Sequence, residues 1–157
     1  MASYFLIDTN VISLIIDAEN NLVADPQKLI EAQWYLEKIS NSHLILSFAT
    51  IAELKRWSVS RRNLQNRKRI EKEVNAIINK SYVVYPTEDT LNSWAEIAHE
   101  AVLRNQFKIK NSGSSQINDL WIAAIAKTHR LILLTNDHGF DWMAELGIQT
   151  LRYGVES

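Results

Sequence analysis

Five short runs of consecutive apolar residues divide the chain. They are Tyr4–Ile7, Leu44–Phe48, Tyr82–Tyr85, Leu131–Leu134 and Ile148–Leu151. A strand with one face in water alternates apolar and polar positions, whereas strands covered on both faces are apolar throughout. The pattern therefore predicts the strands of a buried, parallel sheet.

The segments between these runs are long enough for helices that connect parallel strands. Apolar residues recur at helical spacing in Gln27–Ile39, Arg62–Asn79 and Glu88–Asn105, which predicts amphipathic helices. Asn118–His129 is apolar on nearly every side and is predicted to be a deeply buried helix. Lys108–Gln116 is polar and contains a glycine, so we expect a loop there, a candidate mobile element beside the site.

Alternation of strands and helices predicts an α/β fold, a three-layer sandwich with a parallel sheet between helices. The chain has 157 residues, with only 4 Gly and 2 Pro, and it shows no linker or internal repeat. We therefore expect a single domain over residues 1–157. In such sheets, functional sites form beyond the carboxyl ends of the strands.

Composition excludes several classes of site. The chain has no cysteine, which rules out disulfides and thiolate metal sites and fits a reducing, cytoplasmic location. No basic leader precedes the first apolar run, which stops at Asp8, so a signal peptide is not expected. No apolar run approaches the ~18 residues that a membrane span requires.

The net charge of −1 neither favours nor excludes a nucleic-acid partner, but the basic residues are unevenly distributed. Between positions 55 and 72 lie eight of the 17 Lys and Arg residues: Lys55, Arg56, Arg61, Arg62, Arg67, Lys68, Arg69 and Lys72. Such a cluster suits contact with a polyanion, and it also suits an ordinary solvated helix face.

Four acidic residues are the candidate chemistry-bearing side chains. Asp8 and Asp137 follow the first and fourth predicted strands, Glu53 lies on the helix after the second strand, and Asp119 lies at the start of the buried helix. The topology expected here brings all four to one edge of the sheet. Carboxylates held so close together repel one another, and a divalent cation offsets that repulsion.

Each acid also has a purely structural interpretation. Asp8 is suited to cap the helix that follows it. Glu53 forms a capping-box pattern with Thr50, in which it reaches back to the first amide of the helix. Asp119 in a first helical turn is favoured by the helix dipole, and Asp137 is a typical turn residue. These structural roles do not exclude a second role at a metal site, because a carboxylate has two oxygens.

The type of ligand indicates the ion. All four candidates are hard oxygen donors, and the four histidines show no metal-site spacing. Oxygen ligands favour Mg²⁺ or Mn²⁺ over Zn²⁺. Ions held this way activate water and stabilise charge during phosphodiester hydrolysis. Whether one or two ions bind remains open, and so does any role for His138.

These residues together resemble the motifs of the PIN-domain family. The matching segments, in family order, are FLIDTN at 5–10, SFATIAEL at 47–54, INDLWIAA at 117–124 and LLTNDHGF at 133–140. They span nearly the whole chain. The resemblance implies a five-stranded parallel sheet in the order 3-2-1-4-5 and metal-dependent hydrolysis of RNA, with Mg²⁺ or Mn²⁺ as cofactor.

The resemblance also assigns residues and partners. It places catalysis and metal binding on Asp8, Glu53, Asp119 and Asp137, with Thr9, Asn10, Asn118 and Thr135 in supporting positions. Within this fold the basic cluster, in particular Arg61, Arg62, Arg67 and Lys68, is interpreted as an RNA contact. The small size and the NDLWIAA segment are most similar to VapC-type toxins, which implies an antitoxin partner and a homodimer.

Some features depart from that pattern, and two alternatives remain. The segment from Asp17 to Gln27 is longer than in many such toxins, and Asp141 is either an accessory acid or a helix N-cap. A haloacid-dehalogenase-like phosphatase also carries an Asp after its first strand, but its second Asp is replaced by Asn10 here. A PIN-like module that binds RNA or protein without cutting is the other alternative.

Overall fold

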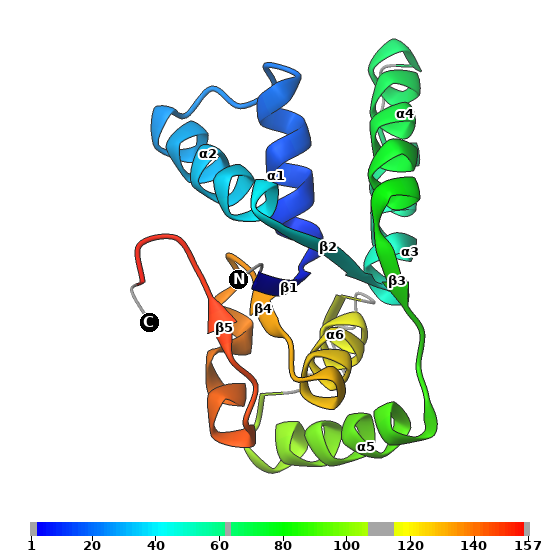
Figure 1. Ribbon diagram of the computed structural model, residues 1–157, viewed down its shortest axis with the longest axis vertical. Coiled ribbons are helices and arrows are strands. Elements are labelled where there is room, and N and C mark those ends of the chain that lie inside the picture. Colours follow the sequence, from blue (N-terminus) through cyan, green and yellow to red (C-terminus); the bar gives the residue numbers. More distant parts are fainter. Residues whose placement is uncertain (1–2, 62–63, 107–114, 156–157) are drawn as a thin grey trace.

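Five parallel strands form the centre of the molecule. The computed structural model describes residues 3–61, 64–106 and 115–155. The strands are β1 (Ser3–Ile7), β2 (Ser42–Ser47), β3 (Tyr82–Val84), β4 (Ile132–Leu134) and β5 (Thr150–Leu151). They pair in the order β3-β2-β1-β4-β5, and every pairing is parallel (Figure 1). The predicted sheet and its order are confirmed, with strand ends displaced by one or two residues.

Helices connect the strands as the pattern predicted. They are α1 (Thr9–Glu19), α2 (Pro26–Ser40), α3 (Phe48–Val59), α4 (Leu64–Lys80), α5 (Glu88–Leu103), α6 (Ser115–His129) and the 3-10 helix η2 (His138–Leu146). The predicted loop Lys108–Gln116 extends too far, because residues 115 and 116 already begin α6, and residues 108–114 lie outside the described residues. Within the described ranges, no helix is long and apolar enough to cross a membrane.

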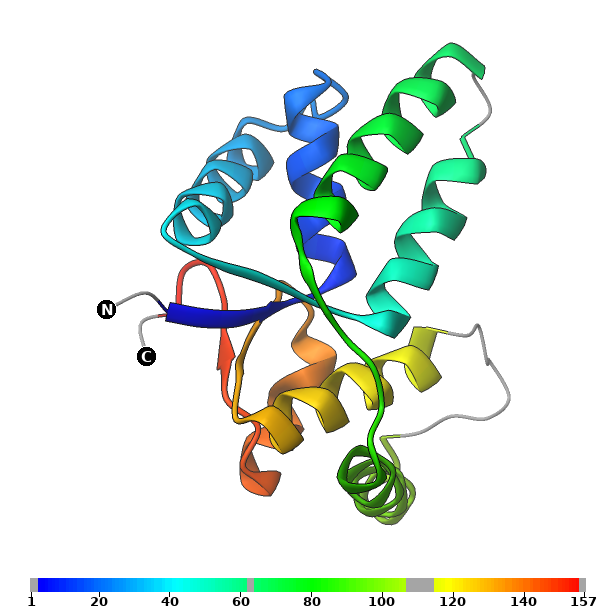
Figure 2. The ribbon, with the colours of Figure 1, turned by 45° about the vertical axis from the view of Figure 1, so that its right-hand side comes forward.

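The sheet separates two apolar cores, because successive strand residues point to opposite faces. Leu6 of β1 packs with residues of α5, α6 and η2, whereas its neighbours Phe5 and Ile7 pack with residues of α1 to α4. Figure 2 shows these two helical layers on opposite sides of the sheet. The expected three-layer sandwich is therefore confirmed, and α6 is its most deeply buried helix, with residues 122 to 126 all buried.

Two helices begin earlier than the sequence pattern indicated. Ser47 caps α3, since its hydroxyl accepts from the amide of Ala49 at 3.1 Å, and the expected capping box between Thr50 and Glu53 is absent. Glu53 therefore lies in the second turn, and its carboxylate does not cap the helix. α6 begins at Ser115, which moves Asp119 out of the first turn and away from the most favourable part of the helix dipole.

Candidate active site

Asp8 is buried at the carboxyl end of β1, where its side chain is held by two hydrogen bonds. Only 2% of the residue is exposed, and its amide extends the sheet by donating to the carbonyl of Leu134 at 3.0 Å. Asp8 caps α1, and its Oδ1 accepts from the amide of Thr9 at 2.8 Å. Its Oδ2 accepts from the hydroxyl of Thr135, also at 2.8 Å. The capping interpretation is thus correct, but capping uses only one of the two oxygens.

Thr135 connects Asp8 to the acid that follows β4. The buried Thr135 hydroxyl donates to Asp8 and accepts from the amide of Asp137 at 3.0 Å. Asp137 in turn caps η2, because its Oδ1 accepts from the amide of Gly139 at 2.8 Å. A side chain at position 139 would bring a Cβ to 3.1 Å from that oxygen, so glycine allows this close cap. One hydroxyl thereby fixes the spacing of two acids.

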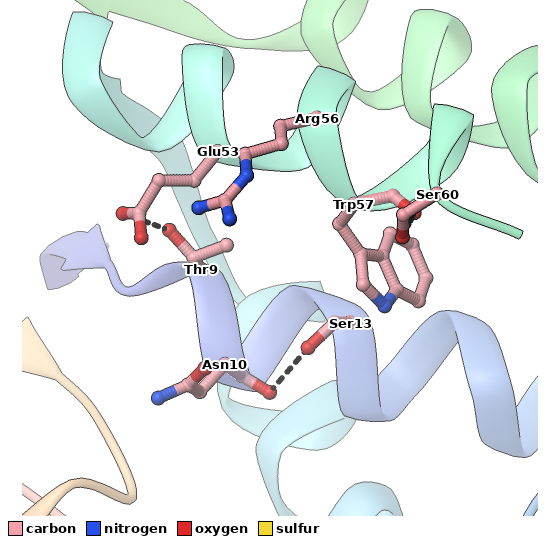
Figure 3. A pocket seen from close by; sticks show the side chains of 7 residues that line it. All are labelled: Thr9, Asn10, Ser13, Glu53, Arg56, Trp57 and Ser60. Atoms are coloured by element: carbon pink, nitrogen blue, oxygen red, sulfur yellow. Dashed lines mark hydrogen bonds between the residues drawn. The ribbon is translucent and has the colours of Figure 1, made fainter. Parts of the chain in front are cut away.

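Glu53 approaches the same edge from α3 and is bound by residues from two other helices. Its Oε1 accepts from the Thr9 hydroxyl at 2.9 Å, a contact between α3 and the first turn of α1 (Figure 3). Burial raises the pKa of Glu53, and hydrogen bonds from Thr9 and Asn118 oppose that rise. The nearby charge of Arg56 also lowers it. Three of the four expected supporting residues thus contact an acid, whereas the exposed Asn10 contacts none of them among the described residues.

Asp119 is the acid most affected by its surroundings. Burial, followed by the charges of the other three acids, raises its pKa to about 8. Asp8 is more deeply buried, yet its pKa rises only to about 6, because the hydrogen bond from Thr135 counteracts the burial. Within the described ranges, no hydrogen bond to the Asp119 carboxylate is found. Repulsion among the acids is therefore least compensated at Asp119.

The four acids come from four separate segments and influence one another electrostatically, as the sequence predicted. However, no three acidic or histidine side chains among the described residues form a group compact enough to hold a metal ion as they stand. The donor set itself fits Mg²⁺ or Mn²⁺, which in proteins are usually held by one or two carboxylates together with water and a substrate phosphate. Mutual repulsion of buried carboxylates is also what a divalent cation relieves.

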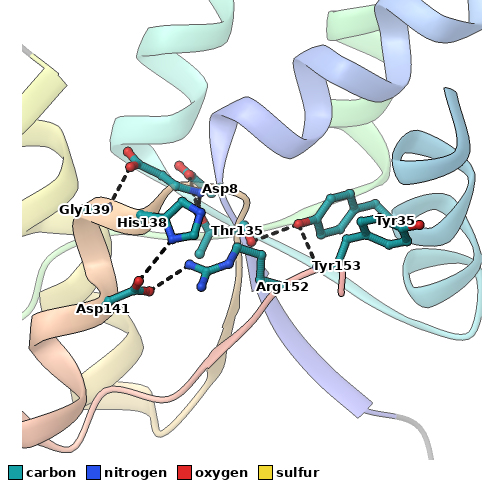
Figure 4. Close-up of polar contacts among 9 residues, drawn as sticks. Asp8, Tyr35, Thr135, His138, Gly139, Asp141, Arg152 and Tyr153 are labelled. Atoms are coloured by element: carbon teal, nitrogen blue, oxygen red, sulfur yellow. Dashed lines mark hydrogen bonds and ion pairs between the residues drawn. The ribbon is translucent and has the colours of Figure 1, made fainter. Parts of the chain in front are cut away.

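A layer behind the acids was not anticipated from the sequence. The fully buried Tyr35 of α2 donates its hydroxyl to the carbonyl of Thr135 at 3.0 Å and accepts from the amide of Tyr153 at 3.1 Å (Figure 4). It thereby ties the end of β4 to the C-terminal segment. Sequence reasoning had no means of finding this role, since an aromatic residue on an amphipathic helix is usually core.

Asp141 lies inside η2, which Asp137 caps, so the N-cap interpretation of Asp141 is wrong. Its carboxylate accepts from Arg152 at 2.7 Å and lies 3.2 Å from Nδ1 of His138 (Figure 4). The hydrogen bond from Arg152 keeps the pKa of Asp141 below its usual value. Asp141 is thus neutralised by its own partner, unlike Asp8 and Asp119.

The basic residues extend away from the acids along α3 and α4. Arg61 pairs with Asp17 at 2.7 Å, and its guanidinium lies 4.4 Å from the ring centroid of Trp57. Arg67 pairs with Glu71 of the same helix, whereas Lys68 is exposed. The predicted RNA contact at position 62 lies outside the described residues.

Comparison with known proteins identifies the family. The family model described as PIN domain matches residues 5–146. The chain belongs to the PIN-domain family. Membership of this family excludes the dehalogenase-like phosphatase alternative. A comparison of this PIN domain with curated proteins gave no match.

Solved structures share the PIN fold seen here. A chain of VapBC-1 from nontypeable Haemophilus influenzae aligns with a TM-score of 0.64 and 23% identity, covering 96% of this chain and 98% of that one. FitAcB from Neisseria gonorrhoeae gives a TM-score of 0.67 and 22% identity, covering 94% and 96%. DNA-bound VapBC from Salmonella typhimurium gives a TM-score of 0.64 and 20% identity, covering 96% of this chain and 98% of that one. At these identities the likeness establishes the fold.

Proposed function

We propose that this PIN domain is a metal-dependent endoribonuclease and the toxin of a toxin–antitoxin pair. The observation that carries the proposal is the gathering of Asp8, Glu53, Asp119 and Asp137 at one edge of the sheet. Two of these acids have strongly raised pKa values because they are buried near like charges. Such an arrangement destabilises the empty fold, so it is best understood as a site built for a ligand of opposite charge.

Mg²⁺ or Mn²⁺ is the cofactor that these residues suit. Asp8, Glu53, Asp119 and Asp137 would hold it, with water and a substrate phosphate completing the shell. When bound, the ion supplies an activated water and charge stabilisation for phosphodiester hydrolysis.

The chain's own residues prepare the site. The Thr135 hydroxyl orients Asp8 and fixes Asp137, and the Thr9 hydroxyl orients Glu53. Because these acceptors are held in place by neighbours, little reorganisation is needed when substrate arrives. Asn10 is exposed and lines the same pocket as Glu53, where its amide would contact a phosphate or base. The basic residues Arg61, Arg62, Arg67 and Lys68 would then continue the path of the RNA.

A partner protein is part of the proposal. Several structures with this fold are described as VapBC or FitAB, and one as a toxin–antitoxin complex from Klebsiella pneumoniae. By analogy, an antitoxin would cover the acidic site. Exposed apolar residues on α5, among them Val102 at 56% and Leu103 at 64%, offer a surface for the expected homodimer. A toxin of this kind would act in the cytoplasm.

The test is cleavage of total cellular RNA by purified protein with Mn²⁺, compared with the same reaction in EDTA. Wild type should cut only with the metal. Asp119→Asn should reduce cleavage by at least about 100-fold, more than loss of a supporting residue typically costs. Asp89→Asn is the matched control, because Asp89 is an exposed acid in the first turn of α5.

The outcomes separate the nuclease from a module that only binds. Equal cleavage by wild type and Asp119→Asn would show a contaminating nuclease and overturn the assignment. RNA binding without any metal-stimulated cutting would favour the binding module.

A further inference from the structure

A groove leads away from the acidic site between α1 and α3. It begins at Glu53, encloses about 280 Å³, and is lined from α1 by Asn10 and Ser13, from α3 by Arg56 and Trp57, and by Ser60, the C-cap of α3 (Figure 3). The α3 residues follow Glu53 at intervals of three, four and seven, so they share one helix face. At the rise of an α-helix, the stretch from Glu53 to Ser60 is roughly 10 Å long.

The walls of the groove suit a flat, neutral ring with a polar edge. Trp57 extends from α3 toward α1, and its ring orientation is restrained by the Arg61 guanidinium. Its indole N–H and the Asn10 amide make no hydrogen bond within the described residues, so both remain available as donors. The Ser13 and Ser60 hydroxyls donate to backbone carbonyls of their own helices, which leaves their lone pairs as acceptors.

The volume sets the size of the ligand. A cavity of about 280 Å³ lies at the lower limit of small-ligand pockets, which suits one heterocycle. One acid and one guanidinium line it, so the groove is not a phosphate cradle. Nucleobases combine an aromatic face with a hydrogen-bonding edge, and aromatic side chains bind them in single-stranded RNA.

We infer that this groove, defined by Asn10, Ser13, Arg56, Trp57 and Ser60, is a subsite for one unpaired nucleobase of the RNA substrate, next to the cut. The inference rests on the proposed nuclease function and adds the place where the enzyme binds a base of its substrate. The base packs against the Trp57 indole while its edge meets Asn10 and the two serine hydroxyls. Unpaired RNA fits this subsite, whereas a base within a duplex does not reach it.

The experiment removes the base and the indole separately and together. A short RNA containing a mapped cut site is prepared with a single abasic nucleotide at each position near the cut. In wild type, one abasic position should lower kcat/KM by about tenfold, as expected for loss of a stacked base. In Trp57→Leu, kcat/KM on intact RNA should fall by a similar factor. The same abasic position should then lower kcat/KM of this variant by less than about twofold.

Two further variants guard against trivial effects. Trp142→Leu is the matched control, because Arg104 lies over that ring at 5.8 Å in a different part of the molecule. It should leave the abasic profile unchanged. Ser13→Gln keeps the Trp57 indole but places a longer side chain in the groove from α1, and should reproduce the loss seen in Trp57→Leu.

The results distinguish this inference from the proposed function. If wild type does not cut RNA with Mn²⁺, the nuclease assignment fails. If wild type cuts but the losses from Trp57→Leu and from every abasic position simply multiply, the subsite is overturned. Normal RNA cleavage by folded Trp57→Leu and Ser13→Gln, with weakened binding of a protein partner, would overturn it in favour of a peptide groove.

Discussion

At the scale of single residues, the site is governed by how each buried carboxylate is compensated. Asp8 has two donors, whereas the described residues provide none to Asp119. The folded state therefore retains a proton on Asp119, with a pKa of about 8, that the unfolded chain releases near 3.8. Protonation of Asp119 therefore contributes fully to the stability of the fold below about pH 3.8. This contribution is lost progressively as pH rises from there through about 8.

Asp119→Asn should accordingly stabilise the metal-free protein, and increasingly so as pH rises. In EDTA, the difference in melting temperature between the variant and wild type should be smallest near pH 4, and by pH 8 it should have grown in favour of the variant by at least about 1 kcal/mol or roughly 2–4 °C. Melting curves at intervals of pH test this, with Asp89→Asn as control. A constant difference across the range would show that Asp119 is not protonated in the fold.

Thr135 provides the second prediction at this scale. Thr135→Val keeps the shape but removes the donor to Asp8 and the acceptor for the Asp137 amide. Cleavage should fall about 10- to 100-fold, the usual cost of losing an orienting partner. Thr128→Val is the control, because that hydroxyl is bonded to the carbonyl of Ala124 within α6. Equal activity of the two variants would remove Thr135 from the site.

At the scale of elements, the acids also serve as structural ends. Asp137 caps η2 and at the same time contributes charge to the cluster. Asn caps helices about as well as Asp, but Ala does not. Asp137→Asn and Asp137→Ala should therefore both lose cleavage, while only Asp137→Ala loses about 1 kcal/mol of unfolding free energy. Urea melts of the two variants measure this. Equal stability would mean that the cap contributes nothing.

The elements also show what the sequence was able to predict. Apolar runs identified every strand, because burial on both faces leaves a clear pattern. Helix starts were predicted less reliably, because several residues near Ser47 are suitable caps. In the structure Ser47 is the cap, which places Glu53 in the second turn. Asp8 and Asp137 were found because they follow strands, and Glu53 and Asp119 because their helices lie next to the same edge of the sheet. Tyr35 and the groove at Trp57 depend on packing between distant segments, which no local pattern records.

At the scale of the whole molecule, the three layers converge on one edge. Asp8 and Thr135 follow the neighbouring strands β1 and β4. Glu53 comes from the helical layer on one face and Asp119 from the layer on the other. A ligand that binds all of them would join both layers through the sheet. Without a cation, repulsion among the four acids weakens the same connection between the two layers.

Mn²⁺ should therefore raise the melting temperature of the entire fold, because it binds the folded state alone. At a concentration 100 times the Kd, the gain is about 2.7 kcal/mol, or roughly 5–10 °C for a chain of this length. The shift should vanish in Asp8→Asn and persist in Asp89→Asn. A midpoint that Mn²⁺ leaves unmoved in wild type would mean that the acids form no cation site, and metal-dependent cleavage would lose its structural basis.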